Sequence, residues 1–217
     1  MAGVKTLQAA IEAILFTMGE SVELSKIAKA IEQDEQTTEE LLRDLMKKYE
    51  SKNRGIRIIE LDKSYQMCTK KEMYDYLIRV AKQTGFDVLL FDDRPAEAVP
   101  ESAALADRFI RVTDFAQDIC AADVPAGAYF VICGHSHADD GIALKAALTK
   151  QAAYVGMLGS RRKMEALFTM LREQGVTEAQ LAAVHTPIGL DLGGETPAEI
   201  AVAIMAQIIA IQHGKQK

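Results

Sequence analysis

The stretch YVGMLGSRRKMEALF at residues 154–168, together with GLDLGGETPAEI at residues 189–200, decides the fold of the second part of the chain. In the first piece an apolar run meets a glycine and then a doubly basic helix start. In the second piece a glycine-rich loop meets another helix start. Two such corners within about fifty residues are typical of an open α/β domain, which places them at the mouth of its ligand cleft.

Strands and helices alternate around these two corners. Apolar runs predict strands over residues 87–91, 128–133 and 154–158, and Phe109–Val112 indicates a weaker one. Helical patterns follow the second and third runs. Thr177 with Gln180 and Thr196 with Glu199 predict capping boxes at the starts of the last two helices. Because the strong strands are continuous apolar runs, we expect a parallel sheet covered by helices on both faces over residues 83–217.

Residues 1–82 show a different pattern, which begins with helices. Apolar residues recur at helical spacing over residues 7–15 and 24–31. The sequence Thr-Thr-Glu-Glu at 37–40 has the form of a capping box that opens a third helix.

A hairpin and a fourth helix complete this first part. Strands are predicted at 56–61 and 65–68, joined by a short polar turn. A second capping box at 69–72 opens a closing helix that reaches about Lys82. Three helices, a two-stranded wing and a closing helix predict a small α+β winged-helix domain.

Composition and charge limit the classes of function. Of the 217 residues, 49% are hydrophobic and 26% are charged, which is ordinary for a soluble globular protein. Residues 1–82 carry 14 basic and 14 acidic side chains, so the whole net charge of −6 falls in residues 83–217. The charge distribution agrees with a boundary near residue 82, and its sign argues against a protein that coats nucleic acid.

The cellular compartment is predicted from hydropathy and cysteines. No apolar run approaches the roughly 18 residues that span a bilayer, and Glu12 interrupts the apolar start, which indicates an amphipathic helix and not a signal peptide. Cys68, Cys120 and Cys133 have no CxxC spacing, so we expect neither a disulfide framework nor a zinc knuckle. We expect a cytoplasmic protein with no membrane contact.

The first part resembles a known family. AIEAILFTMGE, RGIRIIEL and SYQMCTKKEMYDYL, within residues 5–82, are similar to the N-terminal winged-helix domain of segregation and condensation protein B (ScpB). The resemblance implies a role in chromosome segregation and condensation, with a kleisin of the ScpA type or a second copy as partner. The second winged-helix domain that it also implies does not follow.

DNA is a less favoured partner for this first part. The predicted third helix carries Arg43, Lys47 and Lys48 against three acidic side chains, whereas a DNA-reading helix has a clear basic excess. Helix packing or dimerisation is the better interpretation.

The second part resembles a different family. FDDRP, GHSHADD, YVGMLGSRRK and PIGLDLGGETPAEIAVAI, within residues 80–213, are similar to the C-terminal Rossmann-like domain of the xanthine dehydrogenase accessory proteins (XdhC/CoxI). The resemblance implies binding of the molybdenum cofactor (molybdopterin) or of a nucleotide. It also implies a molybdenum hydroxylase apo-enzyme as partner. We expect an accessory factor and not an enzyme, with no catalytic and no metal-ligating residue.

The chain departs from that second family at the start of the α/β part. The resemblance implies a first strand and a glycine-rich turn, and the winged helix stands in their place. We therefore expect an incomplete doubly wound parallel sheet. In the usual order 3-2-1-4-5-6 the first strand is central, so residues 88–91 and 129–133 either pair directly or expose unpaired edges. A chimeric chain without intact activity is a third hypothesis.

The first candidate site residues follow the first remaining strand. Asp92 and Asp93 come directly after the apolar run, with Arg94 beside them. An acid at this place in a dinucleotide fold accepts hydrogen bonds from a ribose hydroxyl. A polar loop in which an aspartate caps a turn is the alternative.

The basic helix start after residue 158 is the second candidate. Cations in a first helical turn oppose the helix dipole, and a bound anion would compensate, since free N–H groups and guanidinium groups suit phosphate. The alternative is a solvated basic patch or pairing with Glu165. The candidate cofactor-binding residues of this corner are Gly156, Gly159, Ser160, Arg161 and Arg162.

Two further loops complete the candidate site. Gly134 and His135 follow a strand end, where His135 is a candidate cofactor contact or general acid and a polar turn is the alternative. Asp191, Gly193 and Glu195 form the last corner, where glycine lets the backbone approach a ligand.

Overall fold

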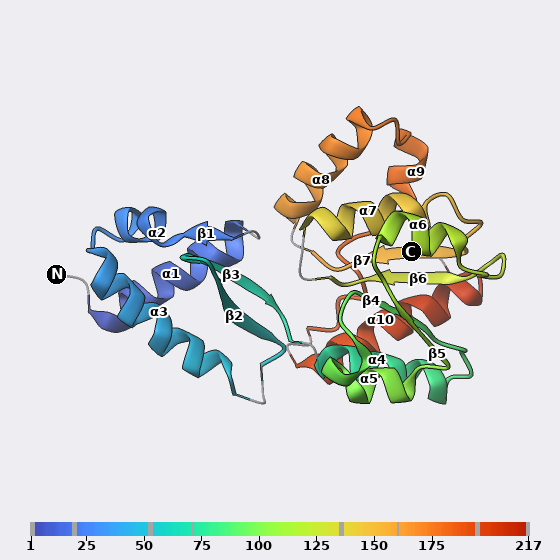
Figure 1. The fold of residues 1–217 in the computed structure, drawn as a ribbon, viewed down its shortest axis with the longest axis horizontal. Coiled ribbons are helices and arrows are strands. Elements are labelled where there is room, and N and C mark those ends of the chain that lie inside the picture. Colours follow the sequence, from blue (N-terminus) through green and yellow to red (C-terminus); the bar gives the residue numbers. More distant parts are fainter. Residues whose placement is uncertain are drawn as a thin grey trace.

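The chain folds into an N-terminal α+β part and a larger α/β part that lie side by side (Figure 1). The computed structural model describes residues 3–18, 21–51, 54–70, 72–134, 137–159, 161–193 and 196–215. No helix in these ranges is both long and apolar enough to cross a bilayer.

The N-terminal part packs helices against a small antiparallel sheet. Its helices are α1 (Val4–Met18), α2 (Leu24–Ala30) and α3 (Glu35–Tyr49), and its strands are β1 (Val22–Glu23), β2 (Ile56–Leu61) and β3 (Ser64–Thr69). The strand order is β1-β3-β2. The predicted two-stranded wing is therefore confirmed and gains a third short strand. The core of this part includes Ile11, Leu15, Ile27, Leu42, Tyr49 and Tyr65.

The third helix begins earlier than predicted. Its N-cap is Asp34, whose carboxylate accepts a hydrogen bond from the backbone N–H of Thr37 at 2.8 Å. The capping box expected at 37–40 is therefore wrong. Aspartate is as good an N-cap as threonine, and the helix gains residues at its start by using it.

Five parallel strands form the α/β part, in two separate sheets. β4 (Leu89–Asp92) pairs with β5 (Arg108–Arg111), and β6 (Tyr129–Ile132), β7 (Tyr154–Met157) and β8 (Val184–His185) pair in that order. All three pairings are parallel. Within the described ranges no strand pairing joins β4 to β6. Of the two alternatives raised by the sequence, direct pairing of these strands is excluded.

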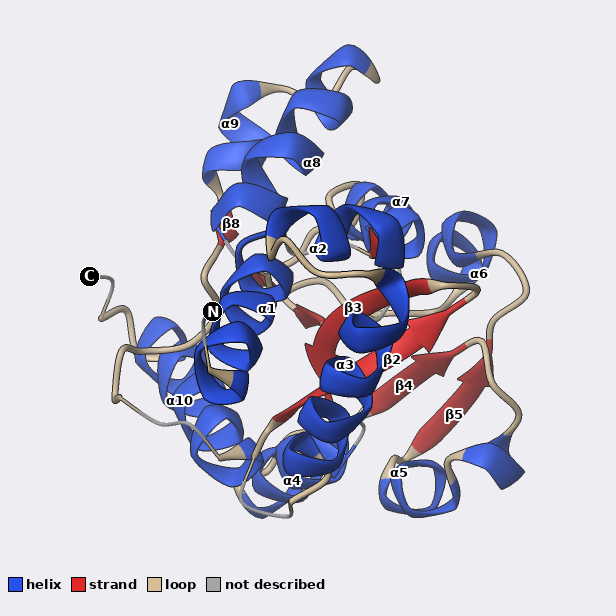
Figure 2. Cartoon of the chain, turned by 90° about the vertical axis from the view of Figure 1, so that its left-hand side faces the viewer, coloured by secondary structure: helices blue, strands red, loops and turns tan. Residues whose placement is uncertain are grey.

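Helices cover both faces of these sheets (Figures 1 and 2). α4 (Glu72–Gln83), α5 (Pro100–Leu105) and α10 (Pro197–Gln212) lie on one side, below the strands in Figure 1. α6 (Phe115–Ala121) and α7 (His137–Ala147) lie on the other side, with α8 (Arg161–Glu173) and α9 (Glu178–Ala182) beyond them. A 3-10 turn, η1 (Ala96–Ala98), precedes α5.

Each side has its own core. Leu144, Met157 and Leu171 are fully buried on the α7–α8 side, and Ile204 is fully buried on the α4–α10 side. The capping boxes predicted for the last two helices are confirmed, with Thr177 paired to Gln180 and Thr196 to Glu199.

α4 belongs by its contacts to the α/β part. Its main neighbours are α10 and α5, and Ala81 lies in the same core as Ile204. The helix that was predicted to close the winged helix therefore packs mainly on α10 and α5. The reason is that the apolar face of α10 offers α4 a long partner, whereas the N-terminal core is already closed by α1, α2 and α3.

This packing predicts which substitution loosens α4. Ile204→Ala removes a fully buried side chain from the α10 face and costs about 2–5 kcal/mol of unfolding free energy. We expect amide exchange in α4 to accelerate in this variant. Leu42→Ala, an equal truncation in the N-terminal core, is the matched control and leaves exchange in α4 unchanged. If Leu42→Ala accelerates amide exchange in α4 and Ile204→Ala does not, the placement of α4 with the α/β part is contradicted.

Candidate functional site

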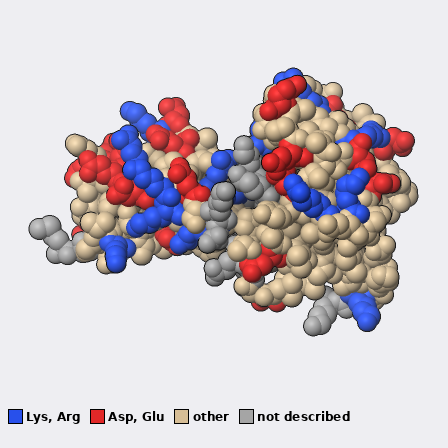
Figure 3. All heavy atoms as spheres, turned by 90° about the horizontal axis from the view of Figure 1, so that it is seen from below, with Lys and Arg blue, Asp and Glu red and all other residues tan. Residues whose placement is uncertain are grey.

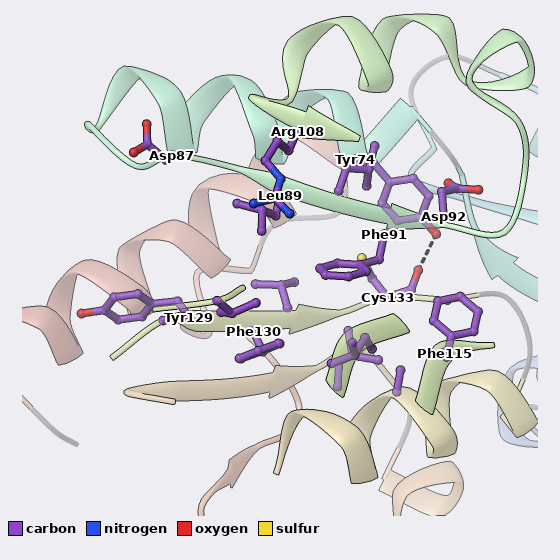
Figure 4. A pocket seen from close by; sticks show the side chains of 18 of the residues that line it. Tyr74, Asp87, Leu89, Phe91, Asp92, Arg108, Phe115, Tyr129, Phe130 and Cys133 are labelled. Atoms are coloured by element: carbon purple, nitrogen blue, oxygen red, sulfur yellow. Dashed lines mark hydrogen bonds between the residues drawn. The ribbon is translucent and has the colours of Figure 1, made fainter. Parts of the chain in front are cut away.

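A cavity of about 650 Å³ lies between the two parallel sheets (Figure 4). It runs along β4 on one side and along β6 on the other, and Figure 4 shows Leu89, Phe91 and Phe130 directed toward it. Its volume is within the range of ligand pockets, about 300–1,000 Å³. This cavity therefore lies where two strands fail to pair.

β4 and β6, the two strands beside the cavity, are less buried than β7. All four residues of β7 are buried, whereas only the last residue of β4 and of β6 is buried. Strands inside a parallel sheet are normally buried on both faces. The cavity therefore leaves six apolar side chains in the sheet half-buried: Leu89, Leu90, Phe91, Tyr129, Phe130 and Val131.

An ion pair occupies the carboxyl end of β4. Arg94 donates from Nε to Asp92 Oδ1 at 2.8 Å and from Nη2 to Asp92 Oδ2 at 2.6 Å. Its backbone N–H also donates to Asp92 Oδ1, at 2.9 Å. The hydrogen bond to Asp92 raises the pKa of the Arg94 guanidinium. Both oxygens of the buried Asp92 carboxylate are thus engaged, and the exposed Asp93 is the acid that faces solvent.

A buried carboxylate also shapes the carboxyl end of β6. Asp140, 2% exposed, accepts a hydrogen bond from the backbone N–H of Gly134 at 2.8 Å. A Cβ at residue 134 would lie 2.2 Å from Asp140 Oδ1, so a larger residue there would displace the Asp140 carboxylate. Burial raises the pKa of Cys133 to about 12, with smaller contributions from Asp140 and Asp92. The Cys133 thiol is therefore protonated and a poor nucleophile at neutral pH.

Two contacts bridge the sheets at the ends of the cavity. At the amino end the ring of Phe86 meets the ring of Tyr129 edge to face, with centroids 5.5 Å apart. At the carboxyl end the Tyr74 hydroxyl, on α4, donates a hydrogen bond to the Cys133 carbonyl (Figure 4). The first contact joins the segment before β4 to β6, and the second joins α4 to the end of β6.

The structure brings together only part of the predicted site. Asp92, Asp93, Arg94 and Gly134 line the cavity at its carboxyl end. Gly159, Asp191 and Gly193 are described and do not line it, and the latter two are exposed. His135, Ser160 and Glu195 lie outside the described residues, as do the side chains of Arg161 and Arg162. The backbone of these two arginines forms the first turn of α8.

Gly156 lies inside the sheet, under an aromatic ring. A Cβ there would lie within 2.6 Å of ring atoms of Tyr154. That ring stacks on His185 at 4.7 Å, and its hydroxyl donates to Gln207 Oε1 at 2.7 Å. Gln207 Oε1 also accepts from the backbone N–H of Gly189 at 2.9 Å. The described contacts of Gly156 are therefore packing contacts that tie β7 to β8 and α10.

Sequence reasoning missed two residues of the cavity. Tyr74 was assigned to a helix of the winged-helix domain, so its contact with β6 was not expected. Phe115, at the start of α6, lines the cavity from the opposite face. Neither position carries a local motif, and the signal that identifies them is tertiary.

The Tyr154–His185 stack predicts a pH dependence of stability. Burial lowers the pKa of His185, so its contribution is present above the unfolded-state pKa near 6.5 and is lost as pH falls below it, because the unfolded chain binds the proton first. The slope for one proton is at most about 1.4 kcal/mol per pH unit, and partial exposure reduces it. We expect His185→Phe, which keeps the stacked ring, to flatten the fall in Tm between about pH 7 and pH 5.

His213→Phe is the matched control, since it removes an imidazole from the exposed end of α10. Thermal unfolding followed by circular dichroism measures both variants. If Tm falls equally between about pH 7 and pH 5 in His185→Phe and in the unsubstituted chain, protonation of His185 does not cause the loss of stability.

Family models match the two parts separately. The model described as XdhC Rossmann domain matches residues 67–208, and the model described as segregation and condensation complex subunit ScpB matches residues 9–88. The two matches overlap across β3, α4 and the approach to β4.

Individual relatives divide in the same way. Segregation and condensation protein B of Agathobacter rectalis is 65% identical over 83 residues, which are 38% of this chain and 44% of that protein. The uncharacterized protein YqeB of Escherichia coli is 30% identical over 129 residues, 59% of this chain and 24% of that protein. The chain thus spans less than half of the curated relatives that it matches.

One solved structure shares the α/β architecture. A crystal structure of a xanthine dehydrogenase from Bacillus halodurans superposes with a TM-score of 0.55 and 25% identity, covering 68% of this chain and 41% of that one. The N-terminal part carries an ScpB winged-helix region. Through residues 67–208, which hold both parallel sheets and the cavity between them, the chain belongs to the XdhC Rossmann domain family.

Proposed function

We propose that the α/β part is a cofactor-binding accessory factor for molybdenum hydroxylases. Its ligand is a phosphate-bearing pterin, the molybdenum cofactor, or a nucleotide. The ligand lies along the carboxyl edge of the strands, with its phosphate at the start of α8 and a hydroxyl-rich group beside Asp93. The two sheets are the halves of one doubly wound sheet whose first strand is missing.

One observation carries this proposal. β4, β6 and β7 are parallel within their sheets, and Asp92, Gly134 and Gly159 follow their carboxyl ends. Ligands of open α/β sheets bind outside this edge, where the strand order reverses. α8 begins directly after the β7 corner with Arg161 in its first turn, and the N-terminus of a helix attracts anions. The family match over the same residues supports the assignment.

The ion pair between Asp92 and Arg94 refines the role of the first candidate acids. Because Arg94 engages both oxygens of Asp92, Asp92 holds the corner in shape. The exposed Asp93 is then the carboxylate that accepts hydrogen bonds from the ligand. In this proposal the chain binds and hands over a cofactor, and it performs no turnover of its own.

Equilibrium binding tests this function. We expect molybdopterin-type cofactor or an adenine nucleotide to bind the unsubstituted chain, and Arg161→Ala/Arg162→Ala to weaken binding at least about tenfold, because two charge-assisted hydrogen bonds to phosphate are lost. Titration calorimetry measures the affinity. Arg43→Ala/Lys47→Ala removes the same charge from exposed positions on α3 and leaves affinity unchanged. The proposal is contradicted if the unsubstituted chain does not bind either ligand, or if Arg161→Ala/Arg162→Ala binds with unchanged affinity.

A second function is favoured by the N-terminal part alone. Its 65% identity to ScpB of Agathobacter rectalis lies over 83 residues that hold a complete core of their own. We infer that this part binds a kleisin or a second copy of the chain. On the face shown in Figure 3, acidic and basic side chains are interspersed over this part, which favours a protein partner over DNA.

Phe16 on α1 gives a test of this second function. Its side chain is 64% exposed, and an exposed aromatic residue is typical of an interface centre. We expect Phe16→Ser to weaken kleisin binding or self-association at least about tenfold by sedimentation velocity. Val202→Ser replaces an exposed apolar residue of α10 and has no effect. If the unsubstituted chain shows neither kleisin binding nor self-association, the inference is refuted.

A further inference from the structure

Two strand edges face one another across the cavity. β4 pairs with β5 on one side, and β6 pairs with β7 on one side, so each has a second edge. The two strands run in the same direction, since Phe86 meets Tyr129 at their starts, and Asp92 and Gly134 line the cavity at their ends. Figure 4 shows the cavity between them. A strand laid in this space would be parallel to both neighbours.

Hydrogen bonds to β5 identify the backbone groups on the free edge of β4. The carbonyl groups of Val88 and Asp92 accept hydrogen bonds from the β5 side, at 3.2 and 2.8 Å. In a parallel ladder successive residues direct their backbone groups to opposite sides. The N–H and C=O groups of Leu89 and Phe91 are therefore directed toward the cavity.

The same reasoning applies to β6. The carbonyl groups of Ala128 and Ile132 accept hydrogen bonds from the β7 side, at 2.9 and 2.8 Å. The backbone groups of Tyr129 and Val131 are therefore directed toward the cavity. By the same alternation the carbonyl group of Cys133 is directed away from β7. It accepts a hydrogen bond from the Tyr74 hydroxyl, as this direction predicts.

The chemistry of the space fits an apolar strand. The six half-buried apolar side chains of β4 and β6 line it, and Phe115, Ile119 and Ala143 line it from the α6–α7 side. Four residues of β4 lie opposite four residues of β6, so an inserted strand of five or six residues, about 3.3 Å each, spans the pair.

The carboxyl mouth of the cavity adds a charge requirement. Among the described residues, Asp92, Asp93, Asp139 and Asp140 line it; Asp92 is paired with Arg94, and Asp93 is exposed. Complementary charge favours a basic residue directly after the inserted strand.

We propose that the cavity between β4 and β6 is an acceptor slot for a β-strand. The occupant is an extended apolar segment of five or six residues, followed by a lysine or arginine, that inserts parallel to both strands and joins the two sheets into one. An extended backbone is the group that pairs with two parallel edges at once, in the manner of strand addition. This slot is independent of the cofactor function proposed above.

The occupant comes from outside residues 1–217. Every strand in the described ranges already has its place in one of the three sheets. The gaps between those ranges are one or two residues long, too short for such a segment. The occupant is therefore a polypeptide segment outside these residues, and a free peptide is a fair substitute for it.

Peptide binding to the full chain tests the slot. The probe is acetyl-Val-Val-Ile-Val-Ile-Lys-amide with a fluorescent label, measured by anisotropy. We expect saturable binding at or below about 100 µM. A matched peptide with proline at its centre, which lacks one N–H and cannot pair on both sides, binds at least about tenfold more weakly. A peptide that ends in glutamate is weaker than the lysine form.

Hydrogen exchange locates the bound peptide. We expect the amides of Leu89, Phe91, Tyr129 and Val131 to exchange at least about tenfold more slowly with peptide present, while amides of the hairpin β2–β3 are unchanged. Because only the peptide is altered, a variant that fails to fold cannot mimic the result.

Four outcomes would overturn the proposal. These are no saturable binding by about 1 mM, equal binding of the proline peptide, protection at β5 in place of the four slot amides, and protection of those amides by self-association of the chain without peptide. The last outcome would make a second copy the occupant. The cofactor titration with Arg161→Ala/Arg162→Ala is unaffected by any of them, so failure of one proposal is distinct from failure of the other.

Discussion

The packing of α4 against α10 holds together two sheets between which the described residues form no backbone hydrogen bond. In a complete parallel sheet the ladder fixes the distance and direction of every strand. Here the ladder is interrupted between β4 and β6, so the distance between them is set by helices on the two faces. The core that joins Ala81 to Ile204 lies under one face, and Phe91 and Phe130 pack against the α7–α8 core on the other. The site at the carboxyl edge depends on this indirect connection.

α4 also explains how two families meet in one chain. The two family matches overlap over residues 67–88, a range that contains α4. One helix sequence satisfies both patterns, but it has one apolar face to bury. That face lies on α10 and α5, so by its contacts α4 groups with the residues that follow it. The boundary expected near residue 82 stays a prediction.

Local signals in the sequence predict what is locally determined. The apolar runs of β6 and β7 and the capping boxes of α9 and α10 need only neighbouring residues, and the structure contains them where they were expected. The cap of α3 was misplaced because two residue types compete for the same N–H groups, and Asp34 lies one turn earlier. β8 has two residues and no periodicity to detect. The contacts of Tyr74 and the ion pair of Asp92 depend on tertiary placement and on a particular loop conformation, which no spacing reveals.

The interrupted sheet changes what the carboxyl edge can do by itself. In a doubly wound fold the first strand ends beside the second, and its glycine-rich turn supplies backbone N–H groups to a phosphate. Between Asp92 and Gly134 this chain has a cavity in that place, and the carboxylates there repel an anion. The function proposed above therefore assigns anion binding to the start of α8, one strand further along. A strand that filled the slot with a basic residue at its end would neutralise part of that acidic mouth. It would also add backbone hydrogen bonds to β4 and to β6, where side-chain contacts now connect the two sides. The two sheets would then share one continuous ladder from β5 to β8, and the distance between β4 and β6 would be set by backbone hydrogen bonds and no longer by helix packing alone.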